Sequence, residues 1–125
     1  MSIEQCSHVK HIVSTIQGQL SPSRDAFDLL QAMFPGGTIT GAPKIRCMEI
    51  LDELESTTRG AYTGSVGYLS LAGDLDLNIL IRSLIIKDNR GYIRVGAGIV
   101  ADSIPEKEYE ETLLKAEALF AAIRN

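Results

Sequence analysis

The last third of the chain gathers residues that could hold an acidic small molecule together with a divalent cation. A short run, Gly96-Ala97-Gly98, precedes a region of helical periodicity that carries Glu108, Glu111 and Lys115. Residues three and four apart stand on one face of a helix, so these two carboxylates and the ammonium would share a narrow arc. Glycines let a ligand approach backbone N–H groups, which bind carboxylates.

Each of these features has an alternative reading. The helical arc also fits a solvated face with a Glu111–Lys115 ion pair, and the glycine run also fits a plain strand-ending turn. Mg²⁺ typically keeps waters and takes one or two protein carboxylates plus substrate oxygens, so the two glutamates suit that cation. The run is not a dinucleotide fingerprint, because the required order of strand, Gly-x-Gly-x-x-Gly and helix is absent.

A second pair of candidates lies upstream, in a region of alternating residues. Arg82 interrupts an apolar run, residues 80–86, that reads as a buried strand. A buried guanidinium needs an anion, and its planar fork matches a carboxylate; an internal ion pair or an edge position is the alternative. Tyr62 begins the preceding strand and would place its hydroxyl near the same anion, unless it is a core tyrosine.

Two further candidates come from the first third of the chain. The glycine- and proline-rich segment 35–44 delivers Thr38 at a helix N-terminus, which attracts anions, although a tight turn with a cap would look the same. It lacks the ending of a phosphate loop. His11 shares one face of a predicted strand with two valines.

The elements that must position these residues form an α+β pattern. Alternation predicts a strand over 8–16, and three antiparallel strands in a meander over 61–98, with turns at 72–74 and 88–91. Three helices are predicted: one after Ser21-Pro22, one starting near 40–43 and one over about 105–123. Their expected buried residues are Phe27, Leu30 and Met33; Ile45, Met48, Leu51 and Leu54; and Tyr109, Leu113, Ala116, Phe120 and Ile123.

Composition bounds the class of protein. A chain of 125 residues with 45% hydrophobic content fits one domain with a core, and a net charge of -4 argues against a nucleic-acid binder. No signal peptide or membrane span is evident, which predicts a cytoplasmic location. Cys6 and Cys47 are expected to be reduced thiols rather than zinc ligands.

Taken together, six strings resemble the C-terminal part of the chorismate-utilising enzymes: anthranilate synthase component I, aminodeoxychorismate synthase component I and, more distantly, the isochorismate and salicylate synthases. The resemblance implies an α+β fold, an antiparallel sheet with packed helices like the C-terminal half of the chorismate-binding fold. It makes residues 1–125 a C-terminal fragment of the catalytic domain. The strings, in the family's order and spacing, are Lys10 to Ser14, Pro35 to Lys44, Met48 to Glu55, Tyr62-Thr63-Gly64, Ile81-Arg82 and Gly96 to Ser103.

The resemblance also implies roles for the candidates. His11 resembles the active-site histidine beside the enolpyruvyl group, and Thr38 a threonine that contacts substrate. Tyr62 and Arg82 resemble the pair that holds the enolpyruvyl carboxylate.

The remaining roles concern the ring carboxylate and the metal. The N–H groups of Gly96, Ala97 and Gly98, with Lys115, resemble binders of the ring carboxylate. Glu111 resembles a direct Mg²⁺ ligand, and Glu108 a direct or water-mediated one.

The implied reaction is addition of ammonia at C2 of chorismate, with Mg²⁺ as cofactor. Aminodeoxychorismate synthase, of para-aminobenzoate and folate biosynthesis, stops at that adduct; anthranilate synthase, of tryptophan biosynthesis, goes on to eliminate pyruvate, with His11 as the natural participant. The stretch from Asp74 to Arg82 resembles the aminodeoxychorismate synthase pattern more. A separate glutaminase is the expected ammonia donor, because neither cysteine lies in a nucleophile elbow.

The chain departs from the family in length. A complete member is several times longer, so an N-terminal part with further metal ligands is expected to be missing and the isolated chain to be inactive. The competing interpretation is a non-catalytic module that self-associates, for instance as a homodimer, through exposed strand edges.

Overall fold

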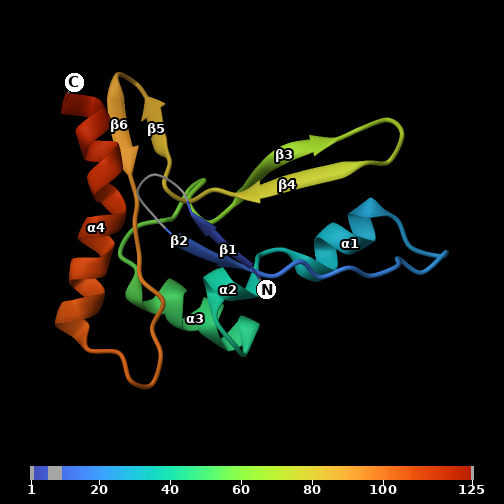
Figure 1. Cartoon of the computed structure of the whole chain (residues 1–125), viewed down its shortest axis with the longest axis horizontal. Helices are drawn as coiled ribbons and strands as arrows, with labels where there is room; N and C mark the ends of the chain where they lie inside the picture. The colour runs from blue at the N-terminus through green and yellow to red at the C-terminus, as the bar shows by residue number, and fades with distance from the viewer. Residues whose placement is uncertain (1, 6–9, 125) are drawn as a thin grey trace.

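Antiparallel hairpins alternate with helices along the chain. Figure 1 shows the computed structural model, which describes residues 2–5 and 10–124. The α+β class expected from the sequence is therefore confirmed. The elements are β1 (Ser2–Gln5), β2 (Lys10–Val13), α1 (Ala26–Met33), α2 (Gly37–Thr40), α3 (Lys44–Leu54), β3 (Ser65–Leu69), β4 (Leu75–Ile79), β5 (Leu84–Lys87), β6 (Arg90–Ile93) and α4 (Pro105–Arg124).

The strands pair as three separate hairpins, β1–β2, β3–β4 and β5–β6. The predicted three-stranded meander is wrong: residues 65–93 form four strands in two hairpins. The break between them falls at residues 80–83, where Arg82 has a φ of 51° and turns the chain out of the extended conformation. The two hairpins diverge at that point in Figure 1.

The β3–β4 and β5–β6 turns lie where the sequence predicted them. Gly73, with a φ of 94°, lies in the β3–β4 turn. Asp88 and Asn89 have φ values of 52° and 57° and form the two-residue connection between β5 and β6. Two successive residues at positive φ match the twist of antiparallel strands, and Asp and Asn tolerate that conformation.

Helix α1 begins later than the sequence predicted. The predicted start was Ser21-Pro22, but the N-cap is Asp25, whose carboxylate accepts hydrogen bonds from the N–H groups of Phe27 and Asp28 at 2.9 and 3.0 Å. The Asp28 carboxylate accepts the Asp25 N–H in return, at 3.1 Å. This reciprocal pair satisfies N–H groups that a start at Pro22 would leave without partners.

The other boundaries differ less. Segment 37–40 forms the short helix α2, and α3 begins only at Lys44. The last helix, α4, agrees with its predicted range. Of the predicted strand 8–16, Lys10–Val13 is β2, whereas residues 8 and 9, like Cys6, lie outside the described residues. Cys47 is a free thiol, as expected.

Very few side chains are buried. Among the described residues, Ala116 at 2% exposure and Thr40 at 8% are buried. The predicted burial is confirmed for Ala116 but is wrong for most of the predicted helix residues: Ile45, Leu54 and Tyr109, for example, are 74%, 77% and 65% exposed. Large hydrophobic side chains therefore remain on the surface of the described part of the chain.

Candidate functional site

Three segments that are distant in the sequence meet at Gly96. Beyond β6 the chain runs alongside α4, and the Lys115 ammonium donates a hydrogen bond to the Gly96 carbonyl at 3.1 Å. On the open side of Gly96 lies Tyr62: a methyl group added at Gly96 would stand 2.9 Å from the Tyr62 hydroxyl. The structure thus brings together Tyr62, Gly96 and Lys115, which the sequence predicted as parts of one site.

Helix α4 carries Glu108, Glu111 and Lys115 at the predicted helical spacing, and the two glutamates form an acidic arc on its surface. The Lys115 ammonium pairs with Glu111 Oε1 at 2.6 Å, so the ion pair of the alternative reading is present as well. Glu108 Oε1 accepts the Ser103 hydroxyl at 2.6 Å, and Ser103 Oγ accepts the Val100 N–H at 3.0 Å. In the described part of the chain, the second oxygen of each carboxylate makes no hydrogen bond or ion pair.

Glu108 and Glu111 carry carboxylates, which are the type of ligand that a magnesium ion takes. Glu108 and Glu111 are three apart on one helix, and each keeps one carboxylate oxygen available. Within residues 2–5 and 10–124, no three His, Cys, Asp or Glu side chains gather as a complete metal cage. Mg²⁺ commonly uses one or two protein carboxylates with waters and substrate oxygens, so the donor set suits it.

Arg82 does not lie in a buried strand, contrary to the prediction. It is exposed, with left-handed backbone, in the connection between β4 and β5. Its guanidinium forms no ion pair with any side chain that the structure describes. The segment remains close to the Tyr62 turn, because the Thr63 N–H donates to the Leu80 carbonyl at 2.8 Å and the Leu80 N–H to the Gly64 carbonyl at 2.9 Å.

Thr38 lies in a different setting from the predicted one, and of His11 only the backbone is described. Thr38 is the second residue of the four-residue helix α2 and is exposed, rather than at the N-terminus of a long helix. The buried hydroxyl of that helix belongs to Thr40, which donates to the Gly36 carbonyl at 3.4 Å. The His11 backbone pairs with Glu4 in the β1–β2 hairpin, and the His11 side chain lies outside the described part.

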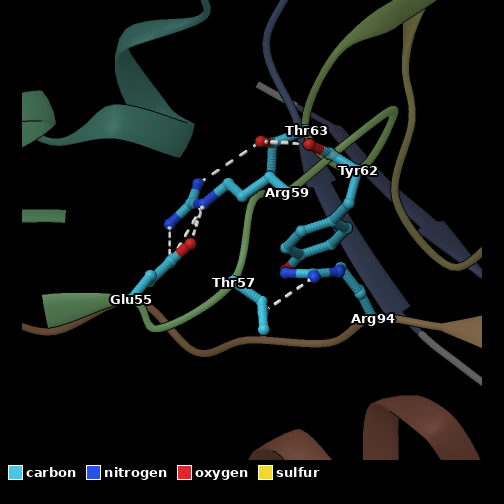
Figure 2. Close-up of polar contacts among 6 residues, drawn as sticks. All are labelled: Glu55, Thr57, Arg59, Tyr62, Thr63 and Arg94. Carbon is cyan, nitrogen blue, oxygen red and sulfur yellow. Dashed lines mark hydrogen bonds and ion pairs between the residues drawn. The ribbon is translucent and has the colours of Figure 1, made fainter. Parts of the chain in front are cut away.

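A polar cluster that no sequence motif indicated lies beside Tyr62, as Figure 2 shows. Arg59 pairs with Glu55 at the end of α3, with Nη2 to Oε1 at 2.6 Å. Hydrogen bonding to Arg59 lowers the pKa of Glu55 below its ordinary value of 4.5 against the opposing effect of desolvation, and Glu55 raises the pKa of Arg59. The only sequence signal was the four-residue spacing, beyond the last turn of a helix.

A glycine-to-alanine exchange tests the close approach at Gly96. In Gly96→Ala, the new methyl group and the Tyr62 hydroxyl must move apart by a few tenths of an ångström. We expect the fluorine NMR signal of Tyr62, in protein that carries fluorotyrosine, to shift. Gly18→Ala is the matched control, because a methyl group there meets nothing within 4 Å. An unchanged Tyr62 signal in Gly96→Ala would mean that the two segments are not in contact.

The family of this chain follows from its sequence. The sequence profile of the chorismate binding enzymes matches residues 1–121, so the chain belongs to that family. None of the described helices is long and apolar enough to cross a membrane.

Individual relatives and a solved structure agree with this assignment. Anthranilate synthase component 1 of Acetivibrio thermocellus is 54% identical over 123 residues, which are 98% of this chain and 25% of the relative. Aminodeoxychorismate synthase component 1 of Bacillus subtilis is 51% identical, over 98% of this chain and 26% of the relative. The crystal structure of anthranilate synthase component I from Streptococcus pneumoniae superimposes with a TM-score of 0.88 at 50% identity, over 94% of this chain and 27% of that one. The chain thus spans about a quarter of the length of these relatives.

Proposed function

We propose that this chain supplies one side of the active site of an enzyme that adds ammonia at C2 of chorismate. The observation that carries the proposal is the meeting of Tyr62, Gly96 and Lys115 from three distant segments. A hydroxyl, a glycine backbone and an ammonium, placed next to two glutamates, offer the donors and the cation site that a dicarboxylate substrate needs.

The roles divide between the two carboxylates of chorismate. Lys115 and the N–H groups of residues 96–98 bind the ring carboxylate. Tyr62 and Arg82 bind the enolpyruvyl carboxylate; the exposure of Arg82 and its lack of an ion pair within the described residues leave its guanidinium free for that task. Thr38 contacts the substrate.

Glu111 and Glu108 hold Mg²⁺ in this proposal. When bound, the ion supplies neutralisation of the ring carboxylate and polarisation of the bond to the departing hydroxyl. Ser103, through its hydrogen bond to Glu108, keeps that carboxylate oriented.

The product distinguishes the two members of the family. We propose aminodeoxychorismate synthase from the Asp74 to Arg82 stretch; relatives of both names are similarly close, at 54% and 51% identity. Release of pyruvate would instead identify anthranilate synthase, with His11 as the participant in the elimination. Since the relatives are named as components 1, a glutaminase partner that supplies the ammonia belongs to the proposal.

The exposed apolar faces support a further part of the proposal. We place residues 1–125 in a longer catalytic domain, whose remaining part covers these faces and completes the site. A self-associating module without catalytic function would use the same faces between two copies of the chain.

Ligand binding to the chain separates these possibilities. We expect isothermal titration with chorismate in the presence of Mg²⁺ to show saturable binding, and Lys115→Met to weaken it roughly tenfold or more, because a charge-assisted hydrogen bond is lost. Lys107→Met is the matched control, since Lys107 is exposed on the same helix and outside the site. No binding, together with dimers in sedimentation, would favour the module.

The chain alone should form neither product. Several groups of the metal and substrate cage are not among its residues, and each missing group costs several kcal/mol of transition-state stabilisation. An ammonia-dependent assay with Mg²⁺ measures this. Robust formation of aminodeoxychorismate or anthranilate by these 125 residues would contradict the proposal that they hold only one side of the site.

A further inference from the structure

Arg59 ties the turn that carries Tyr62 to the end of α3. Glu55 caps that helix, and its carboxylate accepts Arg59 Nε at 2.9 and 3.0 Å and Nη2 at 2.6 Å. The remaining edge of the guanidinium donates to Thr63 Oγ1 at 3.3 Å, as Figure 2 shows. The Arg59 side chain therefore links Glu55 and Thr63, which lie on either side of Tyr62 in the sequence.

The turn needs such a support, because its backbone is strained. Thr63 is β-branched and has a φ of 66°, a conformation that such residues rarely adopt. Thr63 is held by the hydrogen bond from Arg59, by the bond from its own N–H to the Leu80 carbonyl, and by the bond from its hydroxyl to the Tyr62 carbonyl. The Arg59 guanidinium carbon also stands 5.8 Å from the centre of the Tyr62 ring, within the range of a cation–π interaction.

A second arginine ties the same loop to the segment that leads to Gly96. Arg94 donates from Nη2 to Thr57 Oγ1 at 2.9 Å. Tyr62 and Arg94 line a common hollow of about 470 Å³, and in Figure 2 the ring points toward the Arg94 guanidinium. The Tyr62 hydroxyl thus reaches Gly96 from a loop that is anchored at both sides.

Arg59 itself is not available to a ligand. Three of its hydrogen bonds go to Glu55, and its side chain is only 25% exposed. This differs from Arg82, which is exposed and forms no ion pair within the described residues. Arg59 and Arg82 are therefore suited to different tasks.

We propose that Arg59, through its ion pair with Glu55, is a positioning residue that fixes the Tyr62 hydroxyl beside Gly96, where it can bind the enolpyruvyl carboxylate of the substrate. It acts through Tyr62 and does not touch the substrate. The inference rests on the proposed function for its effect on catalysis, but its structural part concerns Tyr62 alone.

The kinetic test measures the effect of Arg59→Lys in the wild-type background and in a Tyr62→Phe background. Lysine keeps the charge and loses the fork, so we expect the KM for chorismate to rise about five- to tenfold, with kcat nearly unchanged, in an enzyme that contains this segment. In a Tyr62→Phe background the same exchange should have no further effect, because the hydroxyl it positions is gone. Arg46→Lys is the matched control: Arg46 also pairs with a glutamate, Glu49, at 2.9 Å, but on the exposed face of α3.

A measurement without substrate keeps the inference separate from the proposed function. The fluorine NMR signal of Tyr62, assigned with Tyr62→Phe, should shift in Arg59→Lys and in the milder Glu55→Gln, and stay unchanged in Arg46→Lys. If these shifts appeared but the wild-type enzyme neither bound nor converted chorismate, the proposed function would fail and the positioning of Tyr62 by Arg59 would stand. The inference is overturned if Arg59→Lys and Glu55→Gln leave the Tyr62 signal unchanged. It is equally overturned if Arg59→Lys raises KM as much in the Tyr62→Phe background as in the wild type.

Discussion

Arg82→Lys is expected to lower kcat/KM for chorismate roughly 10- to 150-fold in a complete enzyme that contains this segment. This factor corresponds to a loss of about 1.5 to 3 kcal/mol of transition-state stabilisation. Lysine keeps the positive charge but loses the planar fork that binds a carboxylate through two hydrogen bonds. The fold should persist, because Arg82 is exposed and Lys meets the same backbone cost as Arg at a φ of 51°.

Steady-state kinetics and a thermal unfolding scan together decide this prediction. Arg90→Lys provides the control, since Arg90 is an exposed arginine of the β5–β6 hairpin. An unchanged kcat/KM in Arg82→Lys, or a loss of folded protein, would make Arg82 a structural residue and remove it from the substrate site.

Glu111→Gln is expected to raise the Mg²⁺ concentration needed for half-maximal activity and to lower turnover by roughly two orders of magnitude. The exchange keeps the shape of the side chain but removes the negative charge that a hard cation requires. It also removes the ion pair with Lys115, whose ammonium lies 2.6 Å from Glu111 Oε1, and leaves only a neutral acceptor there.

A magnesium titration of activity separates these two effects. If Glu111 serves only as the partner of Lys115, the Mg²⁺ dependence stays that of the wild type and only the KM for chorismate changes. Glu110→Gln, an exposed neighbour on α4 outside the acidic arc, should match the wild type in both.

Local interactions made part of this protein predictable. Helix α4 begins at the predicted proline because proline suits the first helical turn, and its Glu108, Glu111 and Lys115 lie as the helical spacing requires. The β5–β6 turn was predictable for the same reason: Asp88 and Asn89 are residue types that accept a left-handed backbone. Both features depend on groups within a few residues of one another.

The errors arose where a local pattern had more than one solution. The apolar run around Arg82 predicts one buried strand, but the chain bends at Arg82 itself, and this bend separates the β3–β4 hairpin from the β5–β6 hairpin. The α1 boundary moved because the carboxylates of Asp25 and Asp28 form a cap that outweighs the proline at residue 22. The apolar stripes of the helices predict core positions, yet most of these side chains are exposed, because periodicity shows which face is apolar and not what covers it.

The sequence by itself determined the secondary-structure class, the turns, the acidic arc and, through its motifs, the family. Only the tertiary structure decided that the Tyr62 hydroxyl lies beside Gly96, that Lys115 reaches the same glycine, and that Arg59 pairs with Glu55 instead of facing a ligand. The physical reason is the range of the interactions: caps, turns and helical spacing are settled within a few residues, whereas these contacts depend on how segments tens of residues apart pack against one another.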